Sequence, residues 1–201
     1  MLSFKTRIYI QFTRIRKPTV NALTINPETK KVDTLDIEMK ANTIYSFFNS
    51  ILIDELSSLN QHTIYCDANA LSEHKKAYFL GEQLLVGDAL IVGLNGMEEV
   101  DAIITKEELE ELIEYEVNPF YSDTLLLLAD HGEVNLYRSF HVSHGDQEIP
   151  LSIEWVLYTF NMADEKTKNY FITELMKAID NGEDVVEFMK KMAGLALSAA
   201  E

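Results

Sequence analysis

The chain has 201 residues, of which 47% are hydrophobic, and a net charge of −16. This length suits one larger domain, or a domain with a small extension, and allows a core that needs neither disulfides nor metal. The excess of acid argues against direct binding to nucleic-acid phosphates or anionic membranes and favours basic partners. The single cysteine, Cys66, cannot form an internal disulfide, and the sequence predicts a cytoplasmic protein.

The charge is unevenly distributed along the chain. Residues 1–31 contain seven basic side chains and one acidic side chain, so this stretch carries +6 and the remainder −22. Within it, residues 7–12 (RIYIQF) alternate apolar with polar or amphipathic side chains, which predicts a strand rather than a signal peptide. Residues 20–25 and 32–39 also favour strands, and the Asn-Pro turn between them predicts a hairpin.

A helix is expected to begin at Ile44, because apolar side chains recur at helical spacing from there to Leu52. The helix should fray near residues 57–58, and a short strand is expected at 63–66. The apolar run 84–92 is broken by a Gly-Asp pair, which predicts a turn or bulge before a strand.

An acidic helix is expected after this strand. Thr105 precedes it, and Glu108 lies at the spacing of a capping box. Acidic side chains in the first turn favour the helix dipole. The Asn-Pro pair at 118–119 is expected to end the helix.

In the last third of the chain, the sequence pattern becomes typical of helices. Residues 124–129 (TLLLLA) and 134–140 (VNLYRSF) are expected to form a hairpin, followed by a polar loop at 141–150. Helices are expected at 151–161, 164–180 and 183–200. The predicted fold class is α+β: a small, mainly antiparallel sheet with packed helices, followed by a helical C-terminal segment. The first domain would span residues 1–149, and a helical extension, residues 150–201, would dock on the sheet or form a small bundle.

A series of short motifs follows one order over residues 20–113. The hairpin ALTINPETKKVDTLDIE precedes a helix with Ile44-Tyr45, the strand IYCDANAL, the passage AYFLGEQLLVGDALIVG and the acidic helix KEELEELI. This order resembles a family of uncharacterised small proteins, a domain of unknown function, met in phages and other mobile elements. The resemblance implies a phage or mobile-element origin but no chemistry, and residues 120–201 fall outside it.

The acidic helix supplies the candidate partner-binding residues Glu107, Glu108, Glu111 and Glu114. On one helix, Glu107, Glu111 and Glu114 would share a face, flanked by Glu108. Such a row of carboxylates could imitate a phosphate backbone and engage the Arg and Lys side chains of a nucleic-acid-binding protein. The alternative is that these charges only solvate the outer face of the helix.

The best candidate metal site is His141, His144 and Asp146. Two imidazoles and a carboxylate are suitable ligands for zinc or iron, but the spacing matches no named motif and a polar loop is the other interpretation. Cys66 is expected to be a buried strand residue rather than a nucleophile. An extended strand would separate it from His62 by about 13 Å.

No phosphate-binding loop, GxSxG or HExxH motif occurs. The sequence therefore predicts a non-enzymatic acidic accessory protein, without a cofactor, that contacts a protein partner with a basic surface. The family resemblance implies that this partner belongs to a host nucleic-acid-handling or defence complex. The alternatives are a metal- or ligand-binding protein or enzyme that uses His141, His144 and Asp146, and a self-associating structural protein.

Overall fold

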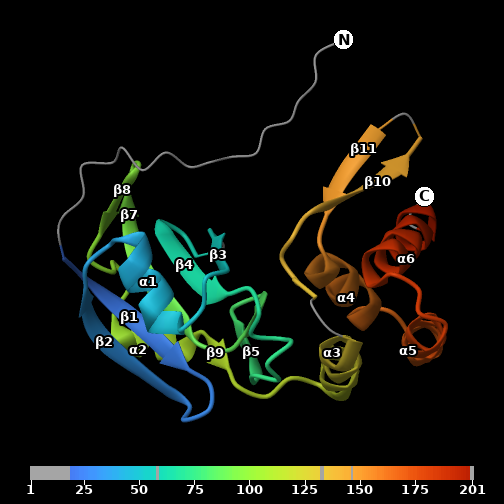
Figure 1. Cartoon of the computed structure of the whole chain (residues 1–201), viewed down its shortest axis with the longest axis horizontal. Coiled ribbons are helices and arrows are strands. Elements are labelled where there is room, and N and C mark those ends of the chain that lie inside the picture. Colours follow the sequence, from blue (N-terminus) through green and yellow to red (C-terminus); the bar gives the residue numbers. More distant parts are fainter. Residues whose placement is uncertain (1–18, 58, 132–133, 146, 200–201) are drawn as a thin grey trace.

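The computed structural model describes residues 19–57, 59–131, 134–145 and 147–199. It shows an α+β fold in which a sheet-rich region is followed by a helical C-terminal region, as the sequence predicts (Figure 1). The strand expected at residues 7–12 lies outside the described part of the chain. No helix in the described ranges is long and apolar enough to cross a membrane.

The main sheet is antiparallel throughout. Its strands in spatial order are β2 (Lys31–Ile37), β1 (Val20–Asn26), β7 (Ala89–Asn95), β4 (His62–Asp67) and β3 (Ile53–Leu56), with β8 (Glu98–Val100) paired to the end of β7. The predicted hairpin of β1 and β2 is confirmed, with Val20 opposite Ile37 and Asn26 opposite Lys31. The sheet therefore combines a local hairpin with the long-range pairs β1–β7 and β4–β7.

Each face of the main sheet is covered by a different layer. On one face, Val20 and Ala22 pack with side chains of α1 (Ala41–Phe48). On the other, Leu23 and Ile25 pack in a cluster with Leu109 of α2 (Lys106–Glu111). A small second sheet adds to this face, formed by β6 (Gln83–Val86), β5 (Ala77–Leu80) and β9 (Ile113–Glu114). Side-chain alternation along β1 thus gives the sheet two apolar faces, and α2 covers one of them.

Helix α1 differs from its predicted extent. It begins at Ala41, three residues before the expected start, and ends at Phe48, because Asn49 adopts the left-handed conformation with φ 53°. Ile51 and Leu52 were predicted to be on its apolar stripe but lie beyond it and are 80% and 53% exposed. The chain then enters strand β3, which prevents the expected continuation of the helix to residues 57–58.

Two further predictions for the C-terminal third are wrong. The run 124–129 lies in helix α3 (Pro119–His131) and not in a strand, because short apolar runs cannot be assigned by periodicity alone. The expected polar loop at 141–150 is a hairpin of β10 (Phe140–His144) and β11 (Gln147–Leu151), in which Phe140 and Val142 face the core. The boundary expected after residue 149 falls within β11.

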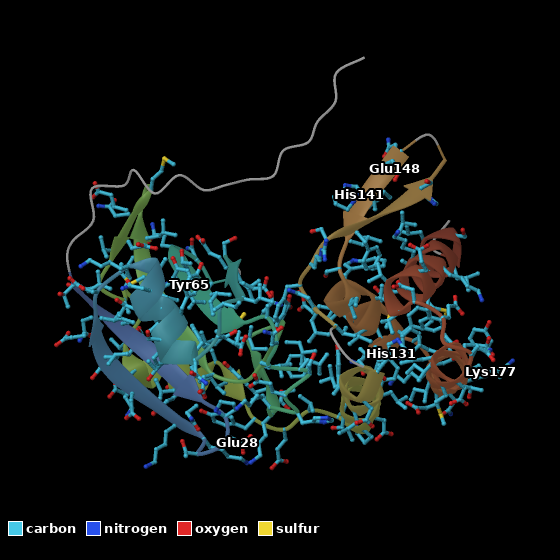
Figure 2. All side chains as sticks on the ribbon, viewed as in Figure 1. Glu28, Tyr65, His131, His141, Glu148 and Lys177 are labelled. Atoms are coloured by element: carbon cyan, nitrogen blue, oxygen red, sulfur yellow. The ribbon has the colours of Figure 1, made fainter. Side chains whose placement is uncertain are left out.

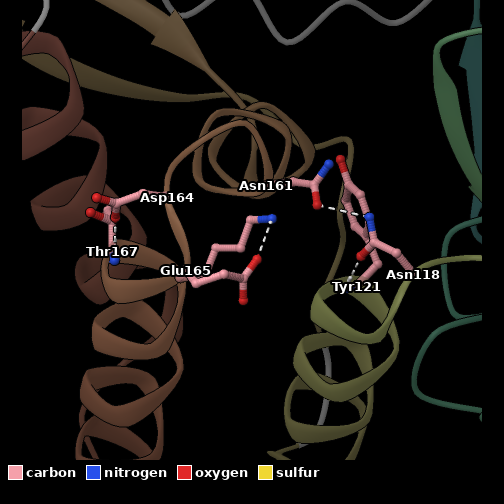
Figure 3. Close-up of polar contacts among 7 residues, drawn as sticks. Asn118, Tyr121, Asn161, Asp164, Glu165 and Thr167 are labelled. Atoms are coloured by element: carbon pink, nitrogen blue, oxygen red, sulfur yellow. Dashed lines mark hydrogen bonds and ion pairs between the residues drawn. The ribbon is translucent and has the colours of Figure 1, made fainter.

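The three predicted C-terminal helices are present as α4 (Ile153–Asn161), α5 (Glu165–Asp180) and α6 (Val185–Ala199). Figure 3 shows polar contacts at the start of α5 and between the end of α4 and the start of α3. The Asp164 carboxylate accepts a hydrogen bond from the N–H of Thr167 at 2.8 Å and caps α5. The Asn118 amide, just before α3, donates to Asn161 at the end of α4 over 2.8 Å. These contacts position α3 beside the later helices.

Glu154 connects the helical region to β6. One of its carboxylate oxygens, Oε1, accepts hydrogen bonds from the Gln83 amide and from the N–H of Leu84, the latter at 3.3 Å. Burial raises the pKa of Glu154, while these two hydrogen bonds act in the opposite direction. The Tyr137 hydroxyl also donates to the Leu84 carbonyl at 3.2 Å. These hydrogen bonds thus satisfy polar groups on both sides of the contact between the helical region and β6.

We expect Glu154→Gln to become more stable relative to the wild type as pH rises. The folded-state pKa lies above the reference value of 4.5, so above that pH the native protein retains a proton that the unfolded chain has released. This contribution is fully present below pH 4.5 and is lost as pH rises through the folded pKa. Glutamine keeps an oxygen for both hydrogen bonds and cannot ionise. Urea unfolding of both proteins from about pH 4 to about pH 8 checks this, and a pH-independent difference would contradict it.

Candidate functional site

The candidate partner-binding residues lie on and just beyond α2. The capping box predicted for this helix is confirmed: Thr105 Oγ1 accepts from the N–H of Glu108 at 3.2 Å, and Glu108 Oε2 accepts from the Thr105 N–H at 2.9 Å. The Glu108 carboxylate also accepts from the Thr105 hydroxyl at 2.8 Å. The bonds from the Thr105 backbone and hydroxyl lower the pKa of Glu108. The Glu108 side chain is therefore engaged in capping the start of α2.

Glu107, Glu111 and Glu114 are exposed. Their predicted arrangement on one helix face needs correction, because α2 ends at Glu111 and Glu114 lies in β9. The helix stops where Ile113 pairs with Leu80 and Glu114 with Phe79 of β5. The three carboxylates thus follow one another along a short helix and the strand that continues from it. We call these three residues the acidic edge.

The acidic edge lacks the ion pairs that several acids on α5 and α6 form. On α5 and α6, Glu165, Glu174 and Glu187 each pair with the lysine three residues later, at 3.1, 2.6 and 2.6 Å. Beside the acidic edge, the two nearby lysines are paired with other acids: Lys106 with Asp33 and Glu110, and Lys30 with Glu116. Glu107, Glu111 and Glu114 themselves form no ion pair within the described ranges. No ion pair with a described residue therefore neutralises their charge.

The two candidate histidine ligands lie on β10, and Figure 2 shows His141 at the outer end of the helical region. His141 and His144 are three residues apart on β10, so their side chains leave opposite faces of the strand. Asp146 lies outside the described residues. Within the part of the chain that the structure describes, no group of three or more His, Cys, Asp or Glu side chains could hold a metal ion. The hairpin therefore does not bring the two imidazoles together.

Cys66 and His62 are both buried on β4 but have separate environments. Burial raises the pKa of the Cys66 thiol far above its usual range, and the charges of Asp54 and Asp67 add to the shift. The nearest polar contact of its sulfur is the Asp54 carbonyl, at 4.0 Å. The His62 ring is occupied by the backbone of residues 60, 103 and 104. This arrangement agrees with a structural cysteine, since the nucleophilic form is the thiolate.

Sequence reasoning missed a polar region around Asn135 and Arg138, between β3 and the helical region. The Asn135 amide donates to Asp54 on β3 at 2.9 Å, and burial raises the pKa of that carboxyl. Two hollows, of about 770 and 260 Å³, meet at this segment. The sequence predicted a strand at 134–140, so these residues were not expected to form a polar region. The signal in the sequence that could have indicated it was Arg138, the only arginine beyond residue 18.

No protein-family model, curated protein or solved structure matches the chain.

Proposed function

We propose that this is a non-enzymatic accessory protein that acts through contact with a protein partner carrying a basic surface, and that the acidic edge is the contact site. The observation that carries the proposal is the exposure of Glu107, Glu111 and Glu114 without an ion pair in the described part of the chain. Guanidinium or ammonium groups of a partner would supply the missing counter-charges through charge-assisted hydrogen bonds. The proposal includes a cytoplasmic location for the protein.

The resemblance of residues 20–113 to a mobile-element family motivates the choice of target. A host nucleic-acid-handling or defence complex presents basic surfaces that normally contact phosphates. Carboxylates spaced along α2 and β9 could occupy such a surface in place of the phosphates. The net charge of −16 would speed the encounter with this partner at low ionic strength.

The test compares three forms of the full chain as bait in host-cell lysate. The first is the wild type. The second carries Glu107→Gln, Glu111→Gln and Glu114→Gln, and keeps Glu108 because it caps α2. The matched control carries the same change in charge on the helical region: Asp123→Asn, Asp180→Asn and Glu183→Gln, three exposed acids that have no ion pair in the described ranges.

We expect the wild type and the control to retain the same basic protein, and the acidic-edge variant to lose it. The capture should also weaken with salt, since exposed charges interact over about 10 Å at about 0.1 M salt. Circular dichroism verifies that all three baits are folded. Equal capture by the wild type and the acidic-edge variant would contradict the contact site, and absence of any basic partner at low salt would contradict the function.

A further inference from the structure

Arg138 stands apart from the other basic residues of the folded region. It is the only arginine after residue 18, in a chain with 33 acidic side chains. Eight of the eleven lysines in the described ranges form ion pairs with carboxylates. Arg138 is exposed and forms no ion pair with a described residue. A guanidinium that remains unpaired amid so many carboxylates is available to bind an anion in its fork of N–H groups.

The backbone of Arg138 is held in place by Asn135. The Asn135 side-chain oxygen accepts hydrogen bonds from the N–H groups of Tyr137 and Arg138, both at 2.9 Å. Its amide nitrogen is in turn anchored to Asp54. This arrangement fixes the backbone of an arginine that lines the hollow of about 770 Å³, a volume in the range of small-molecule sites. Binding would not require ordering of this backbone.

Asp184, an exposed acid, also lines this hollow. Asp184 caps α6, and its Oδ1 accepts from the N–H of Glu187 at 3.0 Å. Glu187 is neutralised by Lys190 at 2.6 Å, whereas Asp184 has no cationic partner in the described part of the chain. No ion pair joins Asp184 to Arg138. Among the described residues, neither Arg138 nor Asp184 therefore has a partner of opposite charge, although both line the same hollow.

The remaining lining suits the body of a small organic molecule. Val186, which is 38% exposed, supplies apolar surface beside buried side chains such as Phe140 and Val185, and Ser139 and His131 supply polar groups. We propose that this hollow binds a zwitterion of the α-amino-acid class, either free or as a short peptide. Its carboxylate pairs with Arg138, its ammonium pairs with Asp184, and its side chain contacts the apolar lining. This site is independent of the acidic edge.

Calorimetry with the full chain tests the proposal, using the common L-amino acids and the dipeptides Gly-Leu and Ala-Phe as probes. For the best amino acid, the matched analogues lack either the amine or the carboxylate; for leucine these are 4-methylpentanoate and 3-methylbutylamine. The variants are Arg138→Gln and Asp184→Asn, because asparagine preserves the helix cap. Lys166→Gln, which removes an unpaired lysine elsewhere, is the control.

We expect at least one amino acid or dipeptide to bind, and the free and peptide forms to be distinguished by which probes do so. Each of the two variants should weaken binding about tenfold or more, as loss of a charged hydrogen bond predicts, while Lys166→Gln leaves it unchanged. Each analogue should bind correspondingly more weakly. Failure of every probe to bind the wild type would overturn the proposal. So would equal binding of the deaminated analogue, or binding that both variants retain.

Discussion

Replacing Phe171 with alanine is expected to destabilise the protein by about 3–5 kcal/mol, the range for large aromatic side chains removed from a core. Phe171 lies on α5 and is fully buried. Its ring centroid is 4.6 Å from that of Phe160, 5.7 Å from Phe188 and 5.8 Å from Phe120. One side chain thus contacts rings from α3, α4 and α6. No neighbour can fill the space without moving its own helix, so most of the cavity should remain.

Urea unfolding measures this loss, and Trp155, the only tryptophan, reports on α4 by fluorescence. The matched control is Tyr170→Ala on the same helix, where the aromatic side chain is 49% exposed and its removal should cost much less. The cluster around Phe171 includes Leu84 and Val86 of β6, so the sheet-rich region should lose stability with it. A cost below about 1 kcal/mol for Phe171→Ala would show that the four rings are not a rigid core.

Local signals explain which elements could be predicted from the sequence. The β1–β2 hairpin has alternating side chains and an Asn-Pro turn, and the starts of α2 and α5 have side-chain caps within three residues. In each case the residues that determine the element are adjacent in the chain. The α+β fold class follows from such local patterns, because each strand and helix can be identified from its own residues without knowledge of its packing.

Two of the wrong predictions share a different cause, which is contact between residues distant in sequence. The periodicity of α2 continues past Glu111, but Ile113 and Glu114 pair with β5 instead, more than 30 residues earlier. The apolar run in α3 satisfies a strand pattern equally well, and only its packing against α4 and α5 selects the helix. Neither result follows from local propensity, because tertiary contacts override it.

The candidate site was predicted in part. The exposure of Glu107 and Glu111 follows from the helix period, and the cap made by Glu108 follows from its spacing to Thr105. The sequence could not supply the long-range ion pairs. Lys106 pairs with Asp33 of β2 as well as with Glu110 of its own helix, and Lys30 pairs with Glu116 after β9. The same holds for Arg138, whose isolation is visible only once the neighbouring carboxylates have positions.

His62→Phe is expected to destabilise the protein by about 2–4 kcal/mol, although it keeps an aromatic ring in the same buried position. His62 Nε2 accepts hydrogen bonds from the backbone N–H groups of Ile103 and Ile104, both at 3.1 Å. The proton of the neutral ring therefore lies on Nδ1, which donates to the Asn60 carbonyl at 2.7 Å. Phenylalanine has no acceptor, so both N–H groups would lose their partner, each at a cost of about 1–3 kcal/mol.

Urea unfolding gives the total cost, and amide hydrogen exchange locates it. We expect the N–H groups of Ile103 and Ile104 to exchange faster in His62→Phe, while those of the β1–β2 hairpin change only with global stability. His74→Phe is the matched control, since His74 is an exposed histidine whose imidazole lies 3.7 Å from Asp130. Unchanged protection of Ile103 and Ile104 in His62→Phe would show that the histidine does not hold this segment.

His62 bears on function because the segment that it holds leads directly into α2. Residues 101–104 cross close over β7: a Cβ built on Gly93, which is opposite His62 in the register, would lie 2.3 Å from the Asp101 carbonyl oxygen. Such an approach requires glycine at that position. The next residue in the chain is Thr105, the cap of α2. His62 and Gly93 thus set where the helix begins.

The position of this helix start determines where Glu107 and Glu111 project from the sheet. Capture of the basic partner should therefore weaken in His62→Phe, although every carboxylate of the acidic edge is retained. Undiminished capture would show that the acidic edge acts through its charge alone and not through its placement on the sheet.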